Sequence, residues 1–166
     1  MKKAFNLQLN LLTKDNLYYL GKLGKPHGLL GFQYINIDKY FRDLDLSNVN
    51  ISIGQKKYKI DNFKKHLKDR NLIKFENIDS VDESESLRNN EVFISSEYKY
   101  LTNKSNLPWP KFFIGYEFSS NVKLVNYFYS SNLIMCTISN DKEDIVVSYD
   151  DDNFKYVENA LYLTID

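Results

Sequence analysis

The chain has 166 residues, and its 22 Lys and Arg balance 22 Asp and Glu, so its net charge is zero. A hydrophobic fraction of 43% is enough for the core of one ordinary domain or of two small ones. The single cysteine, Cys136, excludes an internal disulfide framework, and polar residues interrupt the apolar run from Phe5 to Leu12, so we expect no signal peptide, no membrane association and a cytoplasmic protein.

The first part of the chain predicts a small closed β-barrel. Aromatic residues make up 15% of the chain and favour β structure, because they pack well on pleated faces. Ser80 followed by Glu83 has the spacing of a capping box, which predicts one short helix over residues 80–87. Six β-like runs separated by turn residues supply the strands, at residues 17–23, 30–37, 49–53, 57–63, 71–75 and 91–94.

The second part predicts another small β domain. Residues 96–110 are polar and end in two prolines, a composition typical of a linker. Short β-like runs follow at residues 112–118, 122–129, 133–139, 144–149 and 160–165. We therefore expect an N-terminal extension over residues 1–14, a barrel over 15–95, a linker over 96–110 and a second barrel over 111–166.

The most distinctive stretch is GKLGKPHGLLGFQYINI, residues 21–37, which places four glycines and a proline between two β-like runs. Gly24 and Gly28 are able to adopt positive φ, and Pro26 fixes its own φ. Gly31 is expected to mark a bulge or a close backbone approach. A rigid loop of this kind favours a binding role for the basic side chains in or beside it, which are Lys22, Lys25 and His27.

The order Gly-Lys-Pro-His-Gly-Leu-Leu-Gly at residues 24–31 resembles the opening of the RimM family of bacterial ribosome maturation factors. Residues 72–94 are similar to the strand, short helix, turn and closing strand of that family, with Asn89 in place of the turn glycine. Residues 113–165 resemble the family's C-terminal PRC-barrel domain. The chain departs from the family pattern beside Gly31, where Leu30 and Phe32 replace a basic residue and a glutamate.

This resemblance implies an all-β fold with little helix, in which a six-stranded RimM-type barrel is joined by a linker to a PRC-barrel. It implies a non-catalytic, monomeric factor without a cofactor that binds the head of the small (30S) ribosomal subunit and assists 16S rRNA processing. The implied partners are the small-subunit precursor, the 16S rRNA of the head and small-subunit ribosomal protein number nineteen. The alternative is a divergent PRC-barrel or translation-factor-like binding module with another protein or RNA partner, and an enzyme is the third option.

Charge is unevenly distributed along the chain. Residues 1–110 carry 18 Lys and Arg against 13 Asp and Glu, whereas residues 111–166 carry 4 against 9. Within the basic part, a lysine-rich stretch predicts contacts with RNA phosphates, although a solvated lysine face is the alternative. The lysines concerned are Lys56, Lys57, Lys64, Lys65 and Lys68.

Few residues suggest catalysis or metal binding. His27 and His66 lie on different segments without a partner at ligand spacing, and the run Asp150-Asp151-Asp152 lacks the spacing of a calcium loop, so we expect no metal site. Trp109 stands between two prolines near Phe112. We expect these two aromatic residues to anchor a partner, while the alternative for Trp109 is packing inside the protein.

Overall fold

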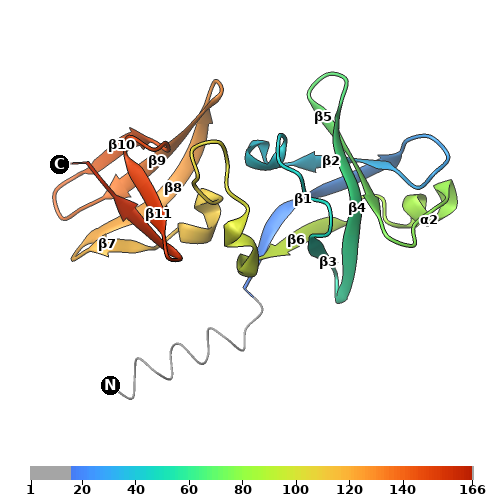
Figure 1. The fold of residues 1–166 in the computed structure, drawn as a ribbon, viewed down its shortest axis with the longest axis horizontal. Coiled ribbons are helices and arrows are strands. Elements are labelled where there is room, and N and C mark those ends of the chain that lie inside the picture. The colour runs from blue at the N-terminus through green and yellow to red at the C-terminus, as the bar shows by residue number, and fades with distance from the viewer. Residues whose placement is uncertain (1–15, 166) are drawn as a thin grey trace, which may run out of the picture. The chain divides into compact units, whose positions relative to one another are not determined.

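The computed structural model describes residues 16–165, which form two compact units with a boundary between Tyr98 and Lys99 (Figure 1). The N-terminal extension predicted over residues 1–14 lies outside the described residues. Within residues 16–165, no helix is both long and apolar enough to cross a membrane. The boundary falls inside the stretch predicted as a linker, and each unit is described separately below.

The first unit is a closed six-stranded barrel in the order β1-β2-β5-β4-β3-β6, with β6 pairing back onto β1. All of its strand pairs are antiparallel. This arrangement confirms the predicted all-β fold with its six-stranded barrel. The strands are β1 (Leu17–Pro26), β2 (Gln33–Ile37), β3 (Asn50–Ile53), β4 (Lys56–His66), β5 (Arg70–Phe75) and β6 (Glu91–Ser95).

Alternation along the strands separates a packed interior from an outer face. In β2, Gln33, Ile35 and Ile37 are buried, whereas Tyr34 is half-buried and Asn36 is exposed. Each fully buried aliphatic side chain contributes roughly 1.5–3 kcal/mol to the free energy of unfolding. The interior therefore fixes which residues of β2, β4 and β5 point outward, and the candidate site lies on that outer face.

Two glycines shape the loop between β1 and β2. Gly28 has φ 69° and Gly31 has φ 94°, both in the region that favours glycine. A Cβ on Gly31 would overlap the carbonyl oxygen of Ile78, so the predicted close backbone approach is present. Gly24 does not use positive φ, because it lies within β1 and faces Tyr34 on β2. The loop occupies residues up to Phe32, which is why β2 begins later than predicted.

The predicted capping box is present at the single α-helix among the described residues, α2 (Val81–Ser86). The backbone N–H of Glu83 donates to Oγ of Ser80 over 3.2 Å, and the Ser80 hydroxyl donates to Oε1 of Glu83 over 2.9 Å. After the helix, Asn89 adopts φ 67°, and its N–H donates to the carbonyl oxygen of Leu23 over 2.9 Å. This bond joins the turn to β1.

The second unit contains a four-stranded antiparallel sheet in the order β10-β9-β8-β7 and a separate two-stranded sheet, β11-β12. Its β composition agrees with the predicted fold class, while the assignment as a PRC-barrel stays a prediction. The strands are β7 (Glu117–Ser119), β8 (Val122–Ser130), β9 (Leu133–Ser139), β10 (Asp144–Ser148), β11 (Phe154–Val157) and β12 (Ala160–Leu163).

The start of the second unit differs from the sequence-based expectation. Part of the predicted strand over residues 112–118 is instead the 3-10 helix η3 (Pro110–Phe113). Pro110 suits a first helical turn and has no backbone N–H to donate to a neighbouring strand. Before it, residues 107–110 are buried although they were predicted as linker. Tyr149 donates its hydroxyl to the carbonyl oxygen of Pro108 over 2.8 Å, so this segment is part of the folded unit.

Candidate nucleic-acid interface

The outer face of β2, β5 and β4 brings together side chains that are distant in sequence. Tyr34 pairs with Leu72 on β5, and Leu72 pairs with Lys64 on β4. Residues directly opposite one another in antiparallel strands project from the same face. Since Gln33 and Ile35 point into the barrel, these three residues point outward. Leu72 is nevertheless only 2% exposed, so neighbouring side chains cover it.

Four residues on this face form a group that we call the histidine cluster: His27, Tyr34, His66 and Arg70. Tyr34 Oη lies 3.1 Å from Nδ1 of His27 and shares a hydrogen bond with it. The ring centroids of His27 and His66 are 4.6 Å apart, and those of Tyr34 and His66 are 5.7 Å apart. The Arg70 guanidinium carbon lies 4.4 Å from the Tyr34 ring centroid. His66 and Arg70 are paired across the β4–β5 hairpin.

A second cation–aromatic contact flanks the cluster. Lys64 Nζ lies 4.5 Å from the ring centroid of Phe32, the last loop residue before β2. Lys64 and Arg70 are both exposed, whereas the aromatic rings beneath them are half-buried. Such contacts hold long cationic side chains over apolar surface while their charged ends remain in water.

The cluster carries positive charge without compensation. Within residues 16–165, no carboxylate forms an ion pair with Lys64, Arg70 or either histidine; Arg70 Nε instead donates to the carbonyl oxygen of Leu67 over 3.3 Å. Partial burial lowers the pKa of His66, and the neighbouring charges of His27, Arg70 and Lys64 lower this pKa further. An anion placed here would oppose those charges.

Several other cations of the barrel are paired with carboxylates. Lys74 is 13% exposed in its side chain and lies 2.8 Å from Asp79 and 3.6 Å from Asp61, and these contacts raise its pKa. The remaining barrel pairs join strands or adjacent turns, and they are Arg42–Asp69, Lys59–Glu76 and Lys65–Asp43. The histidine cluster therefore differs in charge balance from these paired positions.

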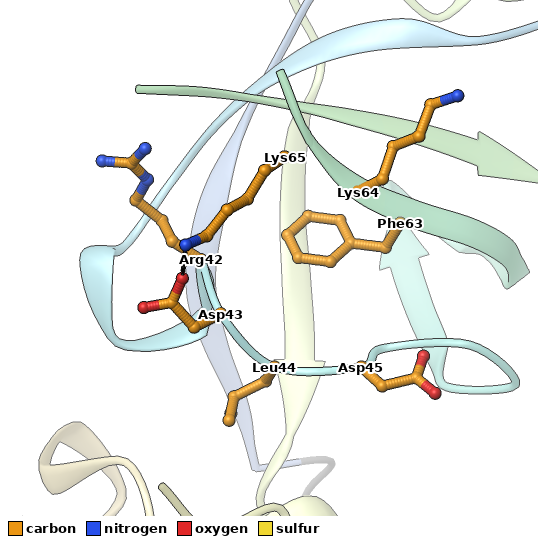
Figure 2. A pocket seen from close by; sticks show the side chains of 7 residues that line it. All are labelled: Arg42, Asp43, Leu44, Asp45, Phe63, Lys64 and Lys65. Atoms are coloured by element: carbon orange, nitrogen blue, oxygen red, sulfur yellow. Dashed lines mark ion pairs between the residues drawn. The ribbon is translucent and has the colours of Figure 1, made fainter. Parts of the chain in front are cut away.

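A hollow of about 330 Å³ lies beside the end of β4. Figure 2 shows Lys65 directed toward Asp43, with which it forms an ion pair, and Lys64 directed away from that carboxylate. The backbone N–H of Ser47 donates to Oδ1 of Asp45 over 2.9 Å and, with the Ser47 hydroxyl, lowers the pKa of Asp45. The hollow thus contains both signs of charge and suits an anion less well than the cluster does. Its lining residues are Arg42, Asp43, Leu44, Asp45, Phe63, Lys64 and Lys65.

The structure separates the lysines that were predicted to contact phosphates. Lys56 and Lys57 lie at the start of β4, and Lys64 follows roughly 23–26 Å further along the strand. Lys65 is paired with Asp43, and Lys68 occupies the β4–β5 turn with φ 59°. These lysines therefore do not make one patch, and Lys64 is the member adjacent to the histidine cluster.

The predicted loop residues have different surroundings. Lys22 and Lys25 are exposed on β1, whereas His27 is half-buried in the cluster. The loop itself is closed by the N–H of His27, which donates to the carbonyl oxygen of Phe32 over 2.9 Å. Among the described contacts, none joins Lys22 or Lys25 to the cluster, so a role for these two lysines stays a prediction.

The prediction that Trp109 and Phe112 present an exposed anchor is wrong. Trp109 is 1% exposed and Phe112 is 7% exposed. Their ring centroids are 5.3 Å apart in an edge-to-face arrangement, and Lys111 Nζ lies 5.3 Å from the Trp109 ring centroid. Side chains this deeply buried do not present an exposed anchor, so for Trp109 the alternative of packing inside the protein holds.

The sequence did not reveal that His27 and His66 meet. The two residues lie on segments that are adjacent only because β2 pairs with β5 and β5 pairs with β4. One local signal was present, since His66 and Arg70 flank a short turn and thus face each other across a hairpin. The contact of His27 with this pair depends on the barrel as a whole.

Comparison with known proteins identifies the first unit. The family model of the RimM N-terminal domain matches residues 18–98. The solved N-terminal domain of RimM from Thermus thermophilus is similar at 15% identity, with coverage of 49% of this chain and 91% of that one and a TM-score of 0.43. RimM from Pseudomonas aeruginosa, described as a putative 16S ribosomal RNA processing protein, is similar at 12% identity, with coverage of 90% and 98% and a TM-score of 0.39. No curated protein matches this chain. The family model thus shows that residues 18–98 match the RimM N-terminal domain.

Proposed function

We propose that this protein is a ribosome maturation factor that binds the precursor of the small ribosomal subunit and assists assembly of its head without covalent chemistry. The observation that carries the proposal is the RimM N-terminal domain over residues 18–98. The proposed partners are the 16S rRNA of the head and small-subunit ribosomal protein number nineteen, and the proposed location is the cytoplasm.

The constrained loop supports a recognition role for its neighbours. Gly31 packs against the backbone at Ile78, and the His27–Phe32 hydrogen bond closes the loop, so its conformation is set before a partner arrives. Preorganisation reduces the entropy cost of binding. Lys25 is exposed at the entrance to this loop and is placed to meet a phosphate or an acidic side chain.

Charge distribution supports a division between the two parts of the chain. The acidic second part, residues 111–166, suits a basic ribosomal protein, whereas the basic first part suits RNA. Complementary charge mainly accelerates association and fixes orientation, so apolar contacts would supply most of the affinity for the ribosomal protein.

Sedimentation with purified small-subunit precursors tests the proposal. The full chain should co-sediment with the precursors, and Lys25→Glu should reduce this association several-fold by reversing an exposed charge. Lys142→Glu, at an exposed position of the second unit, is the matched control and should bind as the wild type does. Failure of the wild-type chain to associate with any small-subunit precursor would overturn the proposed function.

A different protein partner is the second candidate, and one observation favours it. Leu29 and Leu30, at the tip of the loop, are 79% and 68% exposed. Exposed apolar side chains on a rigid loop suit contact with an apolar surface of another protein. Affinity capture of the full chain, followed by identification of bound protein and RNA, distinguishes the candidates: ribosomal components support the first, and a single non-ribosomal protein without RNA supports the second.

A further inference from the structure

We propose that the histidine cluster binds a phosphate group of single-stranded RNA and takes up a proton when it does so. This inference rests on the proposed function for the origin of the RNA, but its chemistry follows from residues of the barrel alone. The site consists of His27, Tyr34, His66 and Arg70, with Lys64 at its margin.

Charge is the first reason for assigning an anion. Arg70 and Lys64 are exposed cations on one outer face, and within the described residues neither forms an ion pair. Four other cations of the same barrel, by contrast, are paired with carboxylates: Arg42, Lys59, Lys65 and Lys74. A phosphate would supply the charge that this face lacks, and Arg70 offers guanidinium donors that match phosphate oxygens.

The aromatic rings are the reason for assigning RNA rather than an acidic protein segment. The ring centroids of His27 and Tyr34 are 5.4 Å apart, His66 lies close to both rings, and all three side chains remain half-buried. Proteins that bind single strands combine cations along the backbone with rings or guanidinium planes on which bases stack. The planar Arg70 group, packed on Tyr34, supplies both kinds of contact at one position.

Proton uptake follows from the groups that face His66. These are His27 from the loop, Tyr34 from β2, Lys64 from the same strand and Arg70 from β5, and none of them is a carboxylate. Partial burial and the three basic neighbours lower the pKa of His66 in the free protein. A bound phosphate stabilises the imidazolium of His66 and raises this pKa. At pH values between the pKa of His66 in the free protein and its pKa in the complex, the complex therefore holds more protons. The association constant should therefore rise as the pH falls.

The test measures binding of the full chain to a short fluorescent single-stranded oligouridylate by anisotropy between about pH 8 and pH 6. If binding is accompanied by uptake of one proton, the association constant of the wild type increases by up to ~10-fold for each unit by which the pH is lowered. His66→Gln should remove most of this pH dependence. Arg70→Gln should weaken binding by roughly 3–10-fold at every pH through loss of a charge-assisted contact. Lys155→Gln, an exposed lysine on β11, is the matched control and should behave as the wild type does.

Two results with the variants would overturn the proposal. One is an unchanged pH dependence in His66→Gln; the other is an Arg70→Gln effect no larger than that of Lys155→Gln. Competition by polyglutamate as strong as competition by unlabelled oligouridylate would also overturn it, because the site would then recognise negative charge alone.

A measurement on the unmodified protein covers the case in which a variant does not fold. The chain contains two histidines, so two sets of imidazole proton resonances report on the cluster directly in NMR spectra of tag-free protein. Oligouridylate should move the titration midpoint of His66 to higher pH, and an unmoved midpoint at saturating oligonucleotide would contradict the proposal.

The same reagents separate this inference from the proposed function. If the full chain associates with small-subunit precursors but its oligonucleotide binding is independent of His66 and Arg70, the inference fails and the proposed function stands. If oligonucleotide binding depends on both residues but no precursor is bound, the inference stands and the proposed function fails.

Discussion

At the scale of single residues, the strictest backbone constraint lies at Gly31. Its φ of 94° is unfavourable for other residues, and a side chain there would overlap the carbonyl oxygen of Ile78. Gly31→Ala should therefore lower the free energy of unfolding by more than ~2 kcal/mol, measured by urea denaturation. Gly28→Ala is the matched control, because Gly28 also has positive φ but has open space around its Cα. It should cost about 1 kcal/mol. Equal losses in the two variants would show that the contact with Ile78 is unimportant.

Burial at Trp109 reverses the expectation drawn from its flanking prolines. Because this side chain is 1% exposed and packs edge-to-face on Phe112, Trp109→Ala should lower the free energy of unfolding by ~3–5 kcal/mol. The folded fraction of the variant should bind small-subunit precursors with unchanged affinity. Thermal denaturation and sedimentation at a temperature where the variant is folded measure the two quantities. A loss of binding with little loss of stability would restore the original interpretation.

At the scale of elements, the capping box makes α2 testable. The helix has six residues and depends on the hydrogen bonds at its N-terminus. The Ser80 hydroxyl donates to the Glu83 carboxylate and accepts a hydrogen bond from the Glu83 N–H. Ser80→Ala should lower the free energy of unfolding by about 1 kcal/mol in urea denaturation. Ser120→Ala, at an exposed turn position, should change it by less than ~0.5 kcal/mol. An unchanged stability of Ser80→Ala would mean that packing of the helix, rather than its cap, determines its formation.

Elements with strong local signals were predictable, and elements set by tertiary context were not. The barrel strands follow alternating apolar residues, and α2 follows its capping box. In contrast, β11 (Phe154–Val157) was missed because the turn that follows it, Glu158-Asn159, has positive φ at both residues without a glycine to signal it. The shaped loop was predictable from Gly28 and Gly31, whereas the meeting of His27 with His66 depends on ladders between distant strands.

At the scale of the whole molecule, salt dependence reports how many cations RNA meets. A single-stranded oligonucleotide that contacts Lys64 and Arg70 should show a log–log slope of association constant against salt of about −1.4, from two neutralised phosphates. Arg70→Gln should reduce the magnitude of this slope by about 0.7. Anisotropy titrations of the full chain at several salt concentrations measure both values, with Lys155→Gln as control. A slope unaffected by Arg70→Gln would place the phosphate contacts elsewhere on the chain.

The ladder between β1 and β6 also governs when the barrel forms during synthesis. β1 ends at Pro26 and pairs with β2 on one edge and with β6 on the other. Because β6 begins only at Glu91, the second edge of β1 stays unpaired until β6 has left the ribosome. At ordinary elongation rates this interval lasts roughly 3–13 s. An open strand edge is a template for pairing with other chains, and closure over a long sequence separation is slow. The nascent chain is therefore most exposed to misassembly between the emergence of β1 and the emergence of β6, and a chaperone that covers β1 would act within that interval.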